Sequence, residues 1–123
     1  MAYWLLKTEP SEYSFDDLVR EKRTTWDGVT NPVAVKHLAA MKKGDQAVIY
    51  HTGKERRAVG LAEITAAGPA LRPGAPLPRP VPLDELKAAA AFAASPLVTI
   101  GRLSVVPLDP KQWQLVLKLG QVR

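Results

Sequence analysis

The sequence contains no cysteine. This absence excludes disulfides, thiolate zinc sites and cysteine nucleophiles, and it is typical of a protein kept in a reducing cytoplasm, which is where we expect this protein. Histidine is scarce too: only His37 and His51 occur, without an H-E-x-x-H pattern. We therefore expect no metal site. Because the sequence also lacks a P-loop, a G-x-G-x-x-G motif and a G-x-S-x-G motif, we expect neither a cofactor nor an enzyme.

Long apolar runs are missing as well. Spanning a bilayer takes about 20 apolar residues, and no segment approaches that length, so we expect no membrane partner. The first ten residues, "MAYWLLKTEP", are apolar over only a few positions and carry no basic leader or small-residue cleavage site. They do not resemble a signal peptide.

What is present suits one globular domain over residues 1–123, and we expect a monomer. Hydrophobic residues make up 46% of the chain, enough for an ordinary core. The charge is unbalanced, with 17 basic and 12 acidic residues, a net charge of +5 and a pI near 9.7. Such a charge favours a polyanionic partner such as nucleic acid, although many basic domains bind none.

Local patterns predict alternating short elements. A strand is expected over residues 3–7 and a helix over 15–21, where Ser14 and Asp17 form a capping box. Asn31 and Pro32 open a second helix that buries Val33, Leu38 and Met41 or their neighbours. Residues 46–66 read as a β-hairpin.

The second half is expected to contain a surface connection, a helix, a strand and a final helix. Six of the eleven prolines fall between residues 69 and 82, so we expect an extended surface connection there rather than a strand. A helix follows over 83–94, then a strand over 101–108 and a helix over 110–119 that Gly120 closes. Together these elements predict an α+β domain built on a small, strongly bent, mostly antiparallel sheet.

The segment "WDGVTN", residues 26–31, places a tryptophan and a glycine in a short irregular stretch between two helices. Trp26 is either a core side chain or one wall of a pocket for a flat ligand. Two further segments, "KTEPSEYS" and "YHTG", also combine cationic or aromatic groups with small hydrogen-bonding ones where a strand ends, which is a common location for a site.

These segments, with "KKGDQAVIYHTG", "AVGLAEI" and "GRLSVVPL", resemble the EVE domain family in order and spacing over nearly the whole chain. That family belongs to the PUA-like superfamily, which includes YTH and ASCH domains. The resemblance implies a small PUA-like bent antiparallel β-barrel with surrounding short helices, and a pocket lined by an aromatic residue. It also implies recognition of modified bases, notably modified cytosines in DNA, while other members of the superfamily bind RNA.

The family motifs transfer to this chain residue by residue, with the Trp26 indole as the stacking wall. The implied pocket residues are Lys7, Thr8, Glu9, Pro10, Trp26, Gly28, Val29, Asn31, Tyr50, His51, Thr52, Arg102, Leu103 and Ser104. Thr30 and Pro32 stand where many relatives carry an arginine and an aromatic residue. Between Gly68 and Leu77 the chain is shorter than its relatives, which indicates either a compact variant or a truncated barrel strand.

Several residues have a structural alternative. Asn31 is also the expected helix cap, His51 a strand-end histidine bonded to a carbonyl, and Ser104 a solvent-facing strand residue. Trp4 and Trp113 are expected in the core. The basic turns are either solvated or contact phosphates, which fix position rather than sequence; the candidates are Lys36, Lys42, Lys43, Lys54, Arg56 and Arg57.

The sequence therefore predicts a non-catalytic module that holds one flipped, modified base of DNA or RNA, with modified cytosine as the leading candidate. Two alternatives remain: a small-molecule or free-nucleoside binding protein that uses the same pocket, and a protein associated with RNA binding or RNA modification.

Overall fold

The computed structural model describes residues 1–122. Its elements in chain order are β1 (Tyr3–Thr8), α1 (Phe15–Glu21), β2 (Thr24–Thr25), α2 (Pro32–Ala40), β3 (Gln46–His51), β4 (Arg57–Ala66), β5 (Ala70–Pro82), α3 (Leu83–Ala88), the 3₁₀ helix η1 (Ala90–Phe92), α4 (Pro96–Thr99), β6 (Val105–Leu108) and α5 (Pro110–Leu119). The strands form one sheet in the order β2-β5-β4-β3-β1-β6.

The sheet is mixed. The pair β1 and β3 is parallel, with Lys7 opposite Tyr50 and Thr8 opposite His51. The other four pairings are antiparallel, so the predictions of a mostly antiparallel sheet and of the β3–β4 hairpin are confirmed. Because β1 and β3 run in the same direction, their carboxyl-terminal ends lie at the same edge of the sheet, and the two predicted motifs that follow them meet there.

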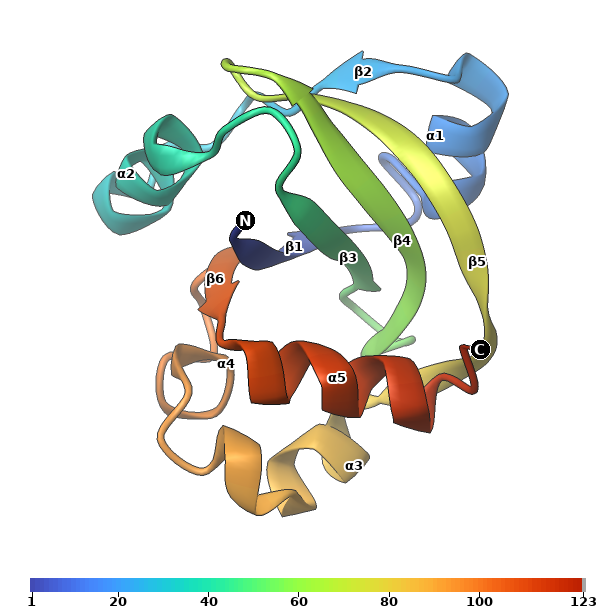
Figure 1. Cartoon of the computed structure of the whole chain (residues 1–123), viewed down its shortest axis with the longest axis vertical. Helices are drawn as coiled ribbons and strands as arrows, with labels where there is room; N and C mark the ends of the chain where they lie inside the picture. The colour runs from blue at the N-terminus through green and yellow to red at the C-terminus, as the bar shows by residue number, and fades with distance from the viewer. Residues whose placement is uncertain (123) are drawn as a thin grey trace.

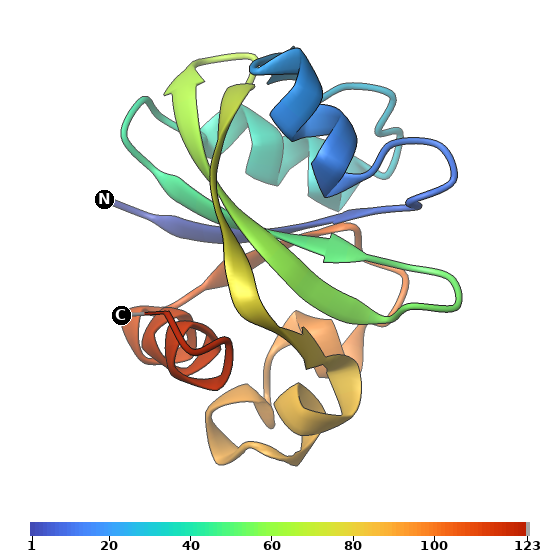
Figure 2. The same ribbon diagram turned by 90° about the vertical axis from the view of Figure 1, so that its right-hand side faces the viewer.

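The sheet curls into a half-barrel, most visibly through the long bent strands β4 and β5 (Figures 1 and 2). Its two edge strands, β2 and β6, do not pair with each other. Instead α5 runs from β6 toward the far end of β5 (Figure 1), where the Arg79 amide donates to the Gly120 carbonyl at 3.1 Å. A helix thus spans the side where a closed barrel would have paired strands.

The core lies inside this curl. Residues 47–51 of β3 are all buried because β1 and β4 flank the strand on both sides. Trp4 and Trp113 are buried as predicted, at 6% and 3% exposure, and the Trp113 ring stacks on Tyr3 with centroids 4.8 Å apart. Among the described residues no buried side-chain nitrogen or oxygen lacks a hydrogen-bond partner.

The helix boundaries follow the local chemistry of the sequence. Ser14 and Asp17 form the predicted capping box of α1. Asn31 caps α2 and Asp109 caps α5, each followed by a proline as the first helical residue. Such caps satisfy backbone donors that have no partner within the helix.

The proline-rich segment is the main difference from the sequence prediction. Residues 70–82 do not form a loose surface connection but strand β5, which pairs with β4 over most of its length. The pairing shifts register three times, and within residues 1–122 the opposite edge of β5 has no strand partner beyond Ala70 and Leu71. Prolines are tolerated at bulges and at strand edges, and both conditions hold here.

One smaller prediction was also wrong. The helix expected over residues 83–94 ends at Ala88, because Ala89 is extended and a 3₁₀ turn then buries Phe92 completely. Tertiary packing of this ring overrides the high helix propensity of the alanines. The predicted buried face of α2 is confirmed for Leu38 and Met41, while at its start Ala34 is buried in place of its neighbour Val33, which is 49% exposed.

Gly60 marks a close contact between β4 and α1. A Cβ atom at this position would lie 2.4 Å from two ring atoms of Phe15, which is buried. We expect Gly60→Ala to lower the free energy of unfolding by about 1–3 kcal/mol, the usual cost of overpacking. Denaturant unfolding measures the change, with Gly101→Ala as the control because an added Cβ there meets nothing within 4 Å. Equal effects at both positions would contradict the predicted clash.

Candidate functional site

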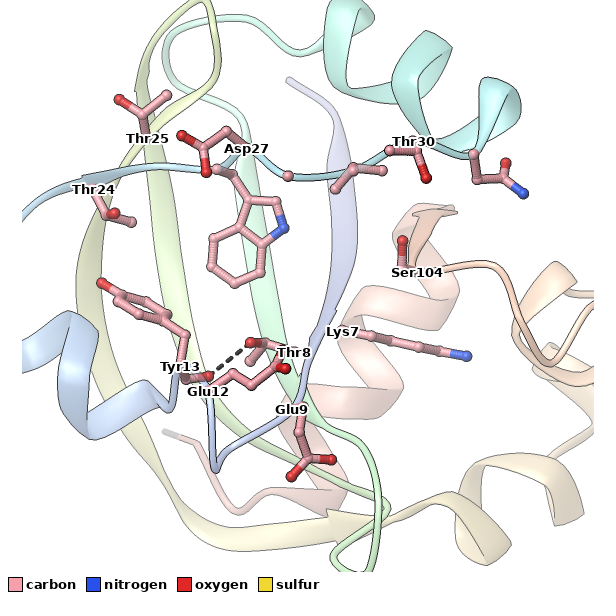
Figure 3. A pocket seen from close by; sticks show the side chains of 14 residues that line it. Lys7, Thr8, Glu9, Glu12, Tyr13, Thr24, Thr25, Asp27, Thr30 and Ser104 are labelled. Carbon is pink, nitrogen blue, oxygen red and sulfur yellow. Dashed lines mark hydrogen bonds between the residues drawn. The ribbon is translucent and has the colours of Figure 1, made fainter.

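A cavity of about 540 Å³ opens where β1 ends (Figure 3). One wall comes from the end of β1 and the turn after it, and the opposite wall from β2 and the irregular segment that leads to α2. Ser104, from the loop before β6, lies beside Lys7 (Figure 3). The complete lining is Lys7, Thr8, Glu9, Glu12, Tyr13, Thr24, Thr25, Trp26, Asp27, Gly28, Val29, Thr30, Asn31 and Ser104.

Trp26 belongs both to the core and to the cavity. It is only 8% exposed, and the Tyr13 ring packs against it edge-on with centroids 6.1 Å apart. Its backbone amide donates to the Pro69 carbonyl at 2.9 Å, which anchors the segment to the β4–β5 turn. The two alternatives for this residue therefore hold together: the indole is packed in place, and it contributes to the cavity lining.

Residues 27–31 offer backbone donors to the cavity. They have no regular secondary structure, and none of their amides donates a hydrogen bond to another residue within 1–122. Gly28 has φ of +75°, a conformation that glycine adopts without steric cost. Asn31 is occupied as a cap, because its Oδ1 accepts from the amides of Val33 and Ala34.

The Lys7 side chain extends from the cavity to the loop before β6. Its Nζ donates to the Gly101 carbonyl at 3.0 Å and lies 5.7 Å from the centroid of the Tyr50 ring. Its backbone amide donates to the Ser104 carbonyl at 2.9 Å, which holds that loop against β1. Burial, and then repulsion by Lys87, lower the pKa of Lys7 from its usual value.

The turn after β1 is fixed by side-chain hydrogen bonds. The Thr8 hydroxyl donates to the Tyr13 carbonyl at 2.7 Å (Figure 3). Glu9 accepts from the Ser11 amide at 3.2 Å and from the Thr52 hydroxyl at 3.4 Å. Thr52 therefore holds the Glu9 carboxylate in position and does not itself line the cavity.

His51 supports the fold beside the site. It is buried, its Nε2 accepts from the Phe15 amide at 3.0 Å, and its Nδ1 lies 3.0 Å from the Glu55 carboxylate. Because Nε2 accepts, the proton of the neutral ring sits on Nδ1 and is donated to Glu55. Both nitrogens are thus engaged within the protein, one at the start of α1 and one in the β3–β4 turn.

The structure brings eight of the predicted pocket residues into the cavity lining and leaves six outside it. The residues outside are Pro10, Tyr50, His51, Thr52, Arg102 and Leu103. Six lining residues were not predicted, namely Glu12, Tyr13, Thr24, Thr25, Asp27 and Thr30. Tyr13 had a sequence signal, since it is the aromatic residue within "KTEPSEYS", but its approach to Trp26 depends on the fold.

The six cations proposed as phosphate contacts are all exposed, and none lines the cavity. Arg57 contacts the Glu55 carboxylate at 3.3 Å, so its charge is partly neutralised. Lys42 and Lys43 precede β3, at the opposite end of that strand from His51. Of the six, Arg56 is close enough to Tyr50 to influence its pKa. Burial raises the pKa of Tyr50, and the positive charge of Arg56 offsets part of that rise.

Residues 1–122 contain no group of three or more histidine, aspartate or glutamate side chains arranged to hold a metal ion. Over the same residues, none of the helices has the length and apolar character needed to span a membrane.

Known proteins provide an independent comparison. A sequence model of the EVE domain matches residues 2–70 and 69–119, and the two pieces adjoin at the tight β4–β5 turn. Thymocyte nuclear protein 1 from Mus musculus is 29% identical over 97% of this chain and 74% of its own length. Shorter matches at about 40% identity, such as that to the human protein, span about half of this chain and a third of the relative.

Solved structures of other proteins share the fold of this chain. A protein from Rhodopseudomonas palustris determined by NMR is 36% identical, with a TM-score of 0.92 over 99% of this chain and 94% of that one. Human THYN1, crystallised in complex with DNA containing 5-methylcytosine, is 28% identical, with a TM-score of 0.87 over 100% and 99% of the two chains. A Zygosaccharomyces rouxii YTH domain shares the fold at 15% identity and a TM-score of 0.62. The chain is a member of the EVE domain family.

Proposed function

We propose that this chain is a non-catalytic nucleic-acid-binding module that holds one flipped, modified base in the Trp26 cavity, with modified cytosine as the leading candidate. The observation that carries the proposal is the coincidence of this cavity with a fold that, in human THYN1, was crystallised with DNA containing 5-methylcytosine. The net charge of +5 is compatible with a polyanionic partner.

The size and lining of the cavity suit a base. Its volume of about 540 Å³ lies within the range of about 300–1,000 Å³ that is typical of small-molecule sites. Extruding a base from its stack costs a few kcal/mol, and one aromatic side chain returns about 1–3 kcal/mol by stacking. Trp26, held by Tyr13 and by the Pro69 carbonyl, is the aromatic residue for this role.

Stacking does not distinguish bases, so polar groups must read the edge of the base. The Ser104 hydroxyl has no hydrogen-bond partner within residues 1–122, and the amides of residues 27–31 are similarly available. Glu12 and Asp27 are exposed carboxylates in the lining. A carboxylate accepts from an amino group such as N4 of cytosine, which favours cytosine over thymine or uracil.

The engaged state of the nearby histidine supports binding rather than catalysis. His51 is held at both nitrogens by Phe15 and Glu55, and it does not line the cavity. In this proposal residues 1–123 act as one binding domain and need no cofactor. Cytoplasmic location and a monomeric state stay predictions, and the mouse relative is by its name a nuclear protein.

The test compares two DNA oligonucleotides that differ only in one 5-methylcytosine, together with the free nucleoside 5-methyl-2′-deoxycytidine. We expect the methylated oligonucleotide to bind more tightly. Ser104→Ala should weaken binding of both oligonucleotides by about 1–3 kcal/mol, because cytosine and 5-methylcytosine present the same polar edge and that edge loses a partner. Thr65→Val is the control, since that hydroxyl bonds the Ala70 carbonyl, outside the cavity.

Two results would count against the proposal. Equal affinity for both oligonucleotides would remove modified-base recognition. Tight nucleoside binding, together with oligonucleotide binding that does not depend on salt, would instead favour a free-nucleoside binding protein, because phosphate contacts make affinity fall with salt.

A further inference from the structure

Cations gather beside the cavity, around the carboxyl-terminal ends of β1 and β3. Lys7 belongs both to the cavity and to this cluster of cations, because it lines the cavity and its Nζ lies over the Tyr50 ring. That Nζ is bonded to the Gly101 carbonyl, and the exposed Arg102 follows directly in the chain. The loop before β6 therefore carries an exposed cation one residue beyond the carbonyl that Lys7 contacts.

Two more cations approach from the other side. The Leu83 amide, at the start of α3, donates to the Arg56 carbonyl at 2.9 Å. Lys87 lies four residues further along the same helix, one turn after Leu83, and it is close enough to Lys7 to lower its pKa. Lys7 and Arg56 thus lie near Tyr50, Lys87 lies near Lys7, and the loop that carries Arg102 is hydrogen-bonded to Lys7.

These four cations have no salt-bridge partner among residues 1–122. The ion pairs in the described structure use other basic residues, namely Arg20, His51, Arg57, Arg72 and Arg79. Two acidic residues lie near this group: Glu9 lines the cavity together with Lys7, and Asp84 acts on the pKa of Tyr50 more weakly than Arg56 does. The positive charge of the cluster is therefore left available to an external anion.

Arg56 also holds an unfavourable backbone conformation. Its φ is +47°, in the left-handed region that is uncommon for residues other than glycine and that Lys22 and Gln121 also adopt in this chain. A glycine would adopt this conformation more readily. Arg56 occupies this position with an exposed side chain.

We propose that Lys7, Arg56, Lys87 and Arg102 form the surface that binds the phosphates next to the flipped base. This inference rests on the proposed function. It places the nucleic-acid backbone on the α3 side of the cavity, away from Lys42 and Lys43, which lie at the opposite end of β3. The shared residue Lys7 joins the base-binding cavity to the phosphate-binding surface, as expected when one nucleotide supplies both groups.

The test uses the triple variant Arg56→Gly, Lys87→Ala, Arg102→Ala and leaves the cavity lining intact. A charge-matched control replaces Lys36, Lys42 and Lys43 with alanine; these are exposed and have no salt-bridge partner in the described part of the chain. Affinity for the single-stranded methylated oligonucleotide is measured between about 50 and 200 mM salt. Each lost phosphate contact should shrink the fold-change in affinity across this range by roughly threefold.

We expect the triple variant to lose salt dependence and oligonucleotide affinity, while nucleoside affinity stays unchanged. Arg56→Gly alone should lose oligonucleotide affinity with an unchanged or higher midpoint of thermal unfolding, so misfolding would not explain the loss. An unchanged salt slope, an equal loss in the lysine control, or a matching loss of nucleoside affinity would each overturn the inference. If the wild-type protein does not prefer the methylated oligonucleotide, the proposed function fails instead.

Discussion

Replacing Trp26 with leucine is expected to reduce both stability and ligand affinity. The indole is buried and packs against Tyr13, and removing a large buried aromatic side chain typically costs about 3–5 kcal/mol of stability when alanine replaces it. Leucine keeps part of the apolar volume and lowers that cost. It removes the aromatic face, so we expect affinity for the methylated nucleoside to fall by about 1–3 kcal/mol.

The control for this prediction is Trp113→Leu. Trp113 is equally buried, stacks on Tyr3 and does not line the cavity. Both variants should unfold at lower denaturant concentrations, but only Trp26→Leu should weaken binding when measured under conditions where both are folded. If the two variants lose affinity equally, Trp26 acts through stability and is not the stacking wall.

Replacing Asp45 with alanine should cause the second large effect. This carboxylate is 5% exposed and accepts from the amides of Ala2 and Lys42, each at 3.0 Å, and from the Trp4 indole at 3.2 Å. Hydrogen bonds to charged groups contribute about 1.5–3 kcal/mol each, and their loss here leaves three donors without an acceptor. We expect a loss of at least that size in denaturant unfolding. The anchored end of β1 begins the strand that carries Lys7, Thr8 and Glu9 to the cavity.

The same network predicts a pH dependence. Burial alone would raise the pKa of Asp45, but the hydrogen bonds from Ala2, Lys42 and Trp4 outweigh it and hold the pKa below its usual value. The native state therefore binds the proton less readily than the unfolded chain does. The stabilising contribution is complete above the unfolded pKa, near 3.8, and is lost as pH falls through the lower pKa of the folded state.

Unfolding free energies measured from pH 6 down to pH 2 check this sign. Asp45→Asn should be less stable than the wild-type protein at pH 6, and its stability should fall less steeply below pH 4. If the two proteins lose stability in parallel, the carboxylate of Asp45 does not contribute to acid unfolding.

Local chemistry was predictable from the sequence where a few adjacent residues decide the structure. Asn31 with Pro32, and Ser14 with Asp17, each specify a helix start through neighbouring backbone donors, and both predictions are confirmed. Strand β5 was missed because its prolines disfavour pairing in general, whereas the actual partner, β4, tolerates them through register shifts. That tolerance depends on how the two strands align, which the composition of residues 70–82 alone does not reveal.

The candidate site was also predictable from the sequence only in part. The segment around Trp26 and the residues 7–9 were placed at the cavity by motif resemblance. Tyr13 and Thr24 also line the cavity but were not predicted there, and the contact between the Tyr13 and Trp26 rings forms only in the folded chain. Thr52 was expected to touch the ligand, but the turn at Gly53 brings the Glu9 carboxylate so close that a Cβ there would lie 2.5 Å from Oε2. The hydroxyl of Thr52 consequently faces Glu9.

The prolines of β5 also bear on aggregation. Beyond its short pairing with β2, the outer edge of this strand is free of other strands within residues 1–122, and a free edge is a template for strand addition by a second molecule. Five of the thirteen residues of β5 are prolines, which have no amide hydrogen to donate. The same residues that made the strand hard to recognise thus protect a half-barrel with open edges from intermolecular β-sheet growth.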